Sequence, residues 1–324
     1  MPVIVCGIDE AGYGPMLGPL CVGLSVMRVE DWCEGDAAPD LWALLADAVA
    51  PALNGSDGRI TVADSKRLKA SRSHTRGPMV HMERGVLAFM VACGAEVTDD
   101  ASLFEILGAR PETLPWSGGA GTALPRGMTA DELAVVSNVL RGSMRRAGVE
   151  MLEMRCEMVG VEAFNETLRR CGSKGATTLG AIGRHLRHVL GRWGSSGDAL
   201  RVVCDSLGAR TRYARVLGEL LKGAQVTALQ ENHRVSRYAV RTDGAEAVVS
   251  FMPEAESKHL PVALASMVAK LVRELTMERF NRYWCRRVPE LKPTAGYVQD
   301  ARRWLAEMDD VVTPTERAAM VRLA

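Results

Sequence analysis

The chain has 324 residues, of which 47% are hydrophobic and 24% are charged, and its formal net charge is +1. This length allows one elaborated domain or two ordinary ones, and a core of that size folds without a disulfide or a structural metal. The nearly balanced charge excludes a chain that is basic throughout, so any surface for nucleic acid would have to be local.

The cysteines and the apolar runs bear on the compartment. The eight cysteines include no CxxC pair and no zinc-ligand spacing, and Cys6 and Cys204 lie in apolar runs, where buried free thiols are common. Reduced thiols predict a cytoplasmic location. The first ten residues reach acidic side chains too early for a secretory signal. No apolar run approaches the ~18 residues of a membrane span, so no membrane partner is expected.

The first part of the chain predicts two strands and then a helix. Residues 2–8 are a β-branched run typical of a buried strand, and residues 16–28 predict a second strand, antiparallel to it. Residues 40–53 predict a helix, and residues 54–58 predict a turn. The apolar residues over 78–95 fit a helix or a strand equally well.

The middle of the chain contains its clearest loop. Residues 108–127 include three prolines and a Gly-Gly pair, and a loop that long in a compact domain is more often functional or disordered than idle. Residues 129–146 predict a helix, because Thr129 and Glu132 have the spacing of a capping box. Residues 150–160 alternate in polarity as a strand does.

The last part of the chain alternates strands and helices. Helices are predicted over residues 176–193 and 262–284, and one or two short helices follow Pro293. A strong short strand, residues 200–204, ends at Asp205. Three further strands are predicted at residues 224–228, 236–241 and 246–252. This mixed order indicates a layered α/β domain.

Acidic residues stand where core elements end or begin. Asp9 and Glu10 follow the first strand, Asp205 follows a later one, and Glu256 lies just ahead of the long helix. Carboxylates gathered there would repel one another unless a divalent cation neutralised them, and Mg²⁺ prefers such oxygen ligands. Two ions about 4 Å apart can activate water and stabilise a leaving oxygen in phosphoryl displacement.

The spacing of these acids leaves the metal site open. Asp9 and Glu10 would face opposite ways on a regular strand, so both can serve one site only if the strand ends there. The chain has 39 acidic residues, and some of them must lie at strand ends by chance.

Five sequence blocks, in the same order, resemble the type 2 (HII) ribonucleases H. GIDEAGYGPMLGP is similar to the family's opening motif GxDEAGRGPxxGP, and it is the most specific of the five. The other blocks match the family's DSK motif, its third carboxylate strand, its long helix and its GY block. These are ADSKRL, RVVCDS, EAESKHLPVALASMVAKLVREL and AGYVQDARRWL, and the five blocks cover about a fifth of the chain.

The resemblance implies a ribonuclease H-like α/β fold with a mixed central β-sheet flanked by helices. It implies a catalytic domain over residues 1–290, with an atypical insertion around 82–145, and a C-terminal helical extension over 291–324. It also implies Mg²⁺ or Mn²⁺ as the cofactor, held as two ions. The expected partner is nucleic acid, cleaved 5′ of ribonucleotides in RNA/DNA hybrids or in DNA duplexes that contain ribonucleotides.

The same resemblance assigns the catalytic and metal-binding residues. Asp9, Glu10 and Asp205 match the family's first three carboxylates. Glu256 lies ten residues before Ser266, where the family has its fourth, usually an aspartate. Glu254 is the rival for this position, but its offset differs by two.

The family's GRG motif, whose backbone grips the nucleotide at the cleavage site, reads Gly12-Tyr13-Gly14 here. The glycines keep a close backbone approach possible, whereas the guanidinium group is lost. Tyr13 is equally well explained as an aromatic ring that stacks on substrate or as a lid over the strand end.

Three further substrate-binding residues follow from the other blocks. Ser65 and Lys66 belong to the DSK block, although Lys66 could also be an ordinary solvated lysine. Tyr297 matches the tyrosine by which the family recognises the deoxyribose next to a ribonucleotide. The long helix and its end offer a possible phosphate-contacting face or a plain exposed helix with i,i+4 pairs; its basic residues are Lys270, Arg273, Arg279, Arg282, Arg286 and Arg287.

Other readings stay open. The fold could support a nuclease that acts on DNA or on structured nucleic acid, or a non-catalytic relative that binds nucleic acid or protein. Four retained acids argue against the non-catalytic reading, because buried charge is costly without a use. His185 and His188 are expected at the surface rather than on a metal, since no other ligand lies near them in the sequence.

Overall fold

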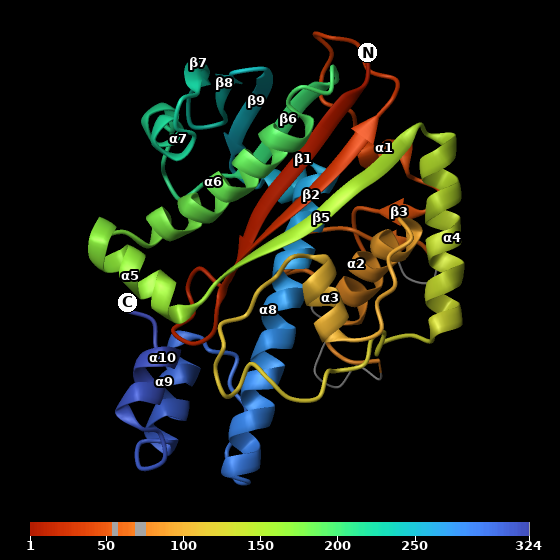
Figure 1. Ribbon diagram of the computed structural model, residues 1–324. Coiled ribbons are helices and arrows are strands. Elements are labelled where there is room, and N and C mark those ends of the chain that lie inside the picture. Colours follow the sequence, from red (N-terminus) through yellow and green to blue (C-terminus); the bar gives the residue numbers. More distant parts are fainter. Residues whose placement is uncertain (54–57, 69–75, 324) are drawn as a thin grey trace.

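The computed structural model describes residues 1–53, 58–68 and 76–323. Its centre is a seven-stranded sheet with helices on both faces (Figure 1). The strand order is β5-β2-β1-β6-β9-β8-β7. The strands are β1 (Val3–Ala11), β2 (Leu20–Val29), β5 (Val149–Val159), β6 (Ala199–Asp205), β7 (Gln225–Glu231), β8 (Ser236–Thr242) and β9 (Ala245–Met252), and β3 (Val49–Ala50) pairs with β4 (Ile60–Thr61) in a small second sheet.

The parallel strands lie at the centre of the large sheet. β1 runs parallel to β6 and β6 runs parallel to β9, whereas β2, β5, β7 and β8 pair antiparallel with their neighbours. The carboxyl ends of β1, β6 and β9 therefore lie at the same edge of the sheet. This mixed sheet flanked by helices is the α/β architecture that the sequence predicts for a ribonuclease H-like fold.

Helices cover the sheet in two layers. In Figure 1, α6 crosses in front of the sheet and α8 lies behind it. Alternate residues of β1 serve the two layers, because Val5 packs into the core that contains α8 and Cys6 into the core that contains α6. The helices are α1 (Leu41–Leu44), α2 (Val80–Ala92), α3 (Asp100–Ile106), α4 (Ala130–Arg146), α5 (Val161–Cys171), α6 (Lys174–Trp193), α7 (Ala214–Leu220), α8 (Leu260–Arg287), α9 (Val298–Glu307) and α10 (Pro314–Met320), with a short 3₁₀ turn η1 (Ala255–Ser257).

Two glycines let α8 lie close against the sheet. A Cβ on Gly7 would lie 2.1 Å from the carbonyl carbon of Pro261, and a Cβ on Gly23 would lie 2.1 Å from the carbonyl oxygen of Ala265. The Ser25 hydroxyl also donates to the Pro261 carbonyl at 2.6 Å. The first turns of α8 are therefore fixed beside β1, close to the acidic pair that follows Gly7.

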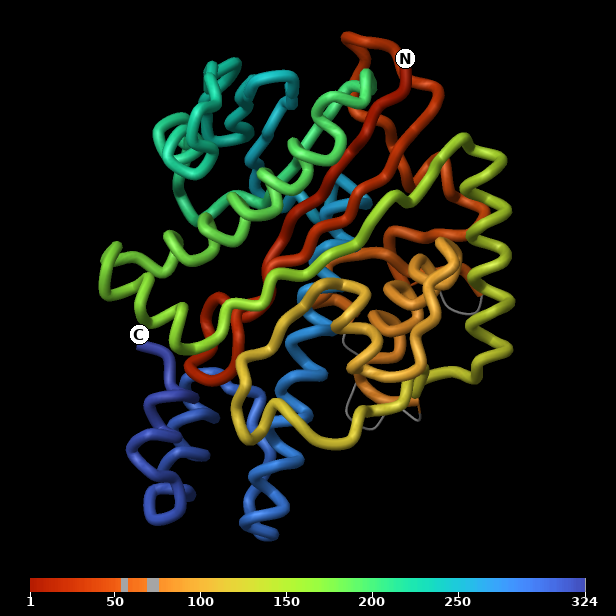
Figure 2. The backbone as a smooth tube through the Cα atoms, viewed as in Figure 1, coloured from red at the N-terminus to blue at the C-terminus, as the bar shows by residue number. Residues whose placement is uncertain are grey.

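The segment predicted as an insertion, residues 82–145, packs on the same face of the sheet as α8. Met82, Phe89 and Leu140 belong to the core that contains Val5. The predicted loop 108–127 forms no helix and no strand beyond an isolated bridge at Ala123. Figure 2 shows it running from α3 toward the C-terminal helices before the chain returns to α4.

The C-terminal helices α9 and α10 pack on the second half of α8. Trp284 of α8 and Trp304 of α9 are both fully buried, with ring centroids 5.8 Å apart. After α10 the chain turns back, and Val321 forms an antiparallel bridge with Leu17. The extension thus returns to the segment between β1 and β2.

Most of the predicted elements are confirmed, but the helix expected over residues 40–53 is wrong. The helix there ends at Leu44, and the chain then forms β3. Trp42 explains part of this, because its Nε1 donates to the Val62 carbonyl at 3.0 Å and draws the two segments together. Residues 78–95 contain a helix, and the predicted turn at 54–58 lies largely outside the described residues.

The eight cysteines are unpaired, as expected. Among the described parts of the chain, no helix is both long enough and apolar enough to cross a membrane.

Candidate metal and nucleic-acid site

The four predicted carboxylates lie together at the carboxyl ends of the central strands. Asp9 and Glu10 are on β1, Asp205 ends β6, and Glu256 is in η1, which follows β9. Burial raises the pKa of Asp9 well above its usual range, and the charges of Glu10 and Asp205 raise it further. Burial, and then the charge of Asp205, raises the pKa of Glu10 to about 7, with a further contribution from Glu256. The four acids therefore share one field, which an added positive charge would stabilise.

From the sequence we expect β1 to end at Asp9 and Glu10, because both side chains could then serve one site. The strand instead continues past this pair. Its pairing with β2 continues to Ala11 and Cys21, but its pairing with β6 ends at Ile8 and Cys204. Beyond Ile8 the β6 side of β1 is open. The charges of Glu10 and Asp205 act on one another across this open side, although the strand continues past Glu10.

The turn after β9 folds over Asp205. Ala255 donates its backbone N–H to Asp205 Oδ1 at 3.2 Å. Glu254 has a left-handed φ of 54° and is exposed, whereas Glu256 is half-buried. Burial raises the pKa of Glu256, and the charge of Asp205 raises it further. Of the two rivals, Glu256 is the one turned toward the other acids.

One oxygen of this site lacks a partner. Glu256 Oε2 is buried and, among the described residues, accepts no hydrogen bond. A buried acceptor left unsatisfied costs about 1–3 kcal/mol. A cation in the site would remove this cost.

Ser65 and Lys66 reach the site from the segment after β4. The Ser65 and Ser266 hydroxyl oxygens lie 3.0 Å apart, and Ser266 also hydrogen-bonds to Asp9. Ser65 is buried, so it holds Ser266 rather than lying open to a ligand. Lys66 is exposed. Burial raises the pKa of Asp205, and the charge of Lys66 opposes that rise.

The side chains as they stand do not form a closed metal cage. In the described residues, no group of three or more His, Cys, Asp or Glu side chains is arranged to hold a metal ion. Mutual repulsion accounts for this, since among the described residues Lys66 is the cation whose charge opposes that of the acids. The donors still fit a hard divalent cation, because all are carboxylate oxygens and one of them is buried without a partner.

Gly12, Tyr13 and Gly14 follow β1 directly. Gly12 has a φ of 91°, and a Cβ there would lie 2.6 Å from Nε of Arg273, so only glycine fits. A Cβ on Gly14 would meet no described atom within 4 Å. The Tyr13 side chain is 42% exposed. The backbone of this motif is thus open on its outer side.

The C-terminal segment holds this motif from within. Arg322 Nη1 donates to the Gly12 carbonyl at 2.5 Å, and the backbone N–H of Arg322 donates to the Met16 carbonyl at 2.9 Å. Met16 in turn donates its N–H to the Gly296 carbonyl at 2.8 Å. Sequence reasoning missed Arg322, since no motif marks a residue so far along the chain.

Tyr297 lies beside the same segment. The residue is 49% exposed, with Arg273 Cζ 5.7 Å and Lys270 Nζ 5.9 Å from the ring centroid. Arg273 is fully buried and donates to the carbonyls of Leu17 and Ala295, at 3.3 and 3.0 Å. Tyr297 is therefore accessible to a ligand, while the backbone next to it is held close to residues 12–19 through the Gly296 carbonyl.

The basic residues of α8 mostly bind the protein itself. Arg279 forms an ion pair with Asp100 at 2.7 Å, and Arg282 donates to the Ala120 carbonyl at 2.8 Å. Both hold the insertion against α8. With Arg273 buried as well, these three residues do not form the possible phosphate-contacting face.

The charge pattern of α8 predicts i,i+4 pairs between Lys270 and Glu274 and between Glu278 and Arg282, and the first of these is present. Lys270 and Glu274 pair at 2.8 Å. Glu278 pairs instead with Arg126 of the insertion, at 2.7 Å. The helix is therefore less exposed than its charge pattern indicates.

The surface position expected for His185 is wrong. Its side chain is 1% exposed, and Nε2 lies 2.9 Å from the Val22 carbonyl oxygen. Burial lowers its pKa to about 4, so it is a neutral core residue. His188 Nε2 lies 2.8 Å from Glu153 Oε2.

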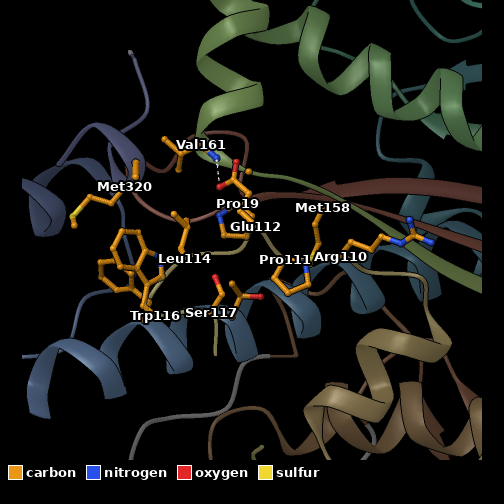
Figure 3. A pocket seen from close by; sticks show the side chains of 15 residues that line it. Pro19, Arg110, Pro111, Glu112, Leu114, Trp116, Ser117, Met158, Val161 and Met320 are labelled. Carbon is orange, nitrogen blue, oxygen red and sulfur yellow. Dashed lines mark hydrogen bonds between the residues drawn. The ribbon is translucent and has the colours of Figure 1, made fainter. Parts of the chain in front are cut away.

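A small cavity marks the junction of the long loop with the C-terminal extension (Figure 3). Glu112 of the loop accepts hydrogen bonds from the backbone N–H groups of Val161 and Glu162, at 3.1 and 3.3 Å, and so caps α5. Trp116 and Met320 also line the cavity. Its volume of about 40 Å³ leaves room for little more than one water. The loop 108–127 therefore ties elements together here.

No protein-family model matches the chain, and no curated protein sequence matches it. The chain superposes on ribonuclease H2 from Pyrococcus horikoshii with a TM-score of 0.45 and 17% identity, covering 97% of this chain and 93% of that chain.

Two further structures give similar values. For the PCNA:RNase HII complex from Archaeoglobus fulgidus the TM-score is 0.43 and the identity 15%, covering 99% of this chain and 94% of that chain. For Bst-RNase HIII in complex with Mn²⁺ the TM-score is 0.41 and the identity 15%, covering 99% of this chain and 66% of that chain. The three alignments each span 97–99% of this chain, at 15–17% identity.

Proposed function

We propose that this protein is a divalent-metal-dependent endonuclease of the ribonuclease H type. Its substrates are RNA/DNA hybrids or DNA duplexes that contain ribonucleotides, and it cuts the phosphodiester bond 5′ of a ribonucleotide. The observation that carries the proposal is the gathering of Asp9, Glu10, Asp205 and Glu256 at one edge of the sheet, next to an open glycine motif. The five sequence blocks supply the substrate class.

The four carboxylates would hold Mg²⁺ or Mn²⁺, as two ions. When bound, such ions supply an activated water and stabilise the leaving oxygen of the displaced phosphodiester. The chain's own residues prepare the site for them. Ser266, held by Ser65, fixes the carboxylate of Asp9, and the exposed Lys66 offsets part of the negative charge.

Three features of the chain would act on the substrate. Gly12 and Gly14 let the backbone approach a sugar, and backbone groups can read the 2′-hydroxyl that tells RNA from DNA. The exposed ring of Tyr297 is free to stack on the deoxyribose next to the ribonucleotide. Lys66 is exposed beside the carboxylates and can pair with a phosphate.

The test is cleavage mapping on a duplex with a single embedded ribonucleotide, with Mg²⁺, Mn²⁺ or EDTA. An all-DNA duplex of the same sequence and a full RNA/DNA hybrid are the controls. We expect a metal-dependent cut on the 5′ side of the ribonucleotide. Equal cutting of the all-DNA duplex would favour a DNA nuclease instead, and tight binding without any cut in either metal would favour a non-catalytic relative.

A further inference from the structure

A second group of basic residues lies on the same face of the sheet as the carboxylates. Arg201 of β6, Arg237 of β8 and His259, which precedes α8, line a cavity of about 330 Å³. Side chains alternate along a strand, so Arg201 points to the same face as Asp205, the last residue of β6. The opposite wall of the cavity is formed by Trp32 and residues 35–39.

These basic groups face one another with no acid paired between them. Burial lowers the pKa of Arg201, and the charge of Arg237 lowers it further. Burial also lowers the pKa of His259, to which the charges of Lys258 and Arg237 contribute. Across the described ranges, neither Arg201 nor Arg237 forms an ion pair, although Asp36 lies on the cavity wall. The charges of Glu34 and Glu246 act on Arg201, and that of Asp40 acts on His259, without an ion pair to either arginine in the described parts of the chain. The two guanidinium groups therefore keep their N–H donors available to a ligand.

The walls hold this arrangement in place. Arg201 Cζ lies 5.5 Å from the centroid of the Trp32 ring, a cation–π contact that fixes the guanidinium without using its N–H donors. Trp32 Nε1 donates to the Ala37 carbonyl at 3.1 Å and so anchors the facing wall. Val248 and Ser250 lie on the sheet side. A preformed pocket with free guanidinium donors suits an anion with several acceptor oxygens, and a phosphate group has that chemistry.

We propose that Arg201, Arg237 and His259 form a phosphate-binding site, separate from the carboxylate site. The phosphate belongs either to the backbone of bound nucleic acid or to a free nucleotide. Arg201 stands four residues before Asp205, roughly 13 Å at ~3.3 Å per residue of strand. That span matches the rise of about four base pairs at ~3.4 Å each. A duplex seated at the carboxylates would therefore reach the cavity with one flank; this step rests on the proposed function.

The first experiment tests the nucleic-acid source. Binding of a labelled hybrid duplex is measured by fluorescence anisotropy in the Asp9→Asn background, which prevents cutting. We expect Arg237→Met to weaken binding several-fold and to lower the slope of log Kd against log salt by about one. Arg237 is exposed, so its replacement does not endanger the fold. Arg241→Met is the matched control, since Arg241 lies on the same strand and pairs with Glu246.

Duplex length gives a second readout. Two shortened duplexes are compared, each with only two base pairs left on one side of the cleavage position. One of these two truncations should abolish the difference in Kd between Arg237→Met and the control. If Arg237→Met, Arg201→Met and Arg241→Met all bind the long duplex as their parent does, nucleic acid is not the ligand.

The second experiment tests a free nucleotide, by calorimetric titration of the wild-type chain with inorganic phosphate and with a 5′-mononucleotide. Binding that is lost in Arg237→Met but kept in Asp205→Asn supports the site whatever the chain does to nucleic acid. If the protein neither binds nor cuts any duplex but still binds phosphate or the mononucleotide through Arg237, the proposed function is contradicted and this inference is supported. No Arg237-dependent binding of duplex, phosphate or nucleotide would overturn the inference.

Discussion

Asp9 is the most buried of the four carboxylates. Replacing this single residue tests the assignment of the metal site most directly. We expect Asp9→Asn to lower kcat at least ~100-fold, because the lost charge loosens ions that contribute several kcal/mol to the transition state. Asp205→Asn should behave alike. Thermal melts without metal should match the wild type or rise, since burial and neighbouring charges disfavour the ionised acid. Wild-type cleavage rates in folded Asp9→Asn would contradict the assignment.

Glu10 gives the site a pH dependence of stability. Its pKa is raised from 4.5 to about 7 in the folded chain, so the folded state binds the proton more tightly than the unfolded state. The stabilisation is complete below about pH 4.5 and is lost as the pH rises through 7. In EDTA, the wild type should therefore lose free energy of unfolding relative to Glu10→Gln over that interval.

Chemical denaturation at pH 4.5, 6, 7 and 8 measures this difference. Above pH 8 the offset between the two proteins should be constant, and added Mg²⁺ should shrink it. An offset that does not change with pH would show that Glu10 has its ordinary pKa.

Tyr13 and Tyr297 bear on substrate choice. A tyrosine offers one hydroxyl and a stacking face, where the family's arginine offers five donors. We expect Tyr13→Arg to lower KM on a duplex with one ribonucleotide and to change kcat little. Tyr297→Ala should reduce the preference for that duplex over a full hybrid. Steady-state kinetics on the two substrates would separate these effects, and an unchanged preference in Tyr297→Ala would remove that residue from the site.

At the scale of elements, η1 decides which glutamate serves the site. The backbone N–H of Ala255 donates a hydrogen bond to Asp205 Oδ1. This turns Glu256 toward the other acids and leaves Glu254 exposed. Glu256→Gln should therefore reduce kcat by at least tenfold more than Glu254→Gln does. The two variants differ by the same single charge, so each controls for the other. Equal losses would mean that the turn rearranges when metal binds.

The strands and the long helix could be predicted from the sequence because their signals are local. β6 is a short apolar run that ends at an acid, and α4 begins at the capping box of Thr129 and Glu132 that the structure contains. The helix expected over 40–53 fails because a distant contact, Trp42 to Val62, favours a different path.

The candidate site divides in the same way. The motif acids could be named from their blocks. The open side of β1 could not be predicted from the sequence, because it depends on where the pairing of β1 with β6 stops. The buried arginines of the site could not be recognised either, since a charged residue in a sequence gives no sign of its burial.

For the whole molecule, the C-terminal extension is part of the candidate site. Arg322 joins the glycine motif to the end of the chain, and it stacks 4.6 Å above the ring centroid of Phe164. We expect Arg322→Met to raise KM several-fold and to leave kcat within about twofold, because the segment that Arg322 holds is the one we propose to contact substrate rather than metal. Stability should change little, since a buried and unpaired charge is replaced by an apolar chain of similar length.

Arg317→Met is the matched control for this change, because Arg317 lies nearby on α10 and pairs with Asp309 at the surface. Hydrogen exchange supplies a readout independent of activity, and the amides of residues 12–17 should exchange faster in Arg322→Met alone. A fall in kcat with KM unchanged would instead place Arg322 in support of the metal site.

The bond between Arg322 and Gly12 closes a loop of 310 residues, and this has a consequence for synthesis. Chains are made from the N-terminus and begin to fold as they emerge, so β1 and its acids are made more than 310 residues before Arg322, which secures the glycine motif. A ribosome-bound or prematurely ended chain would carry the acids without a secured motif. The hold of the glycine motif on a nucleic acid would then be complete only after Arg322 has been made and has folded against Gly12.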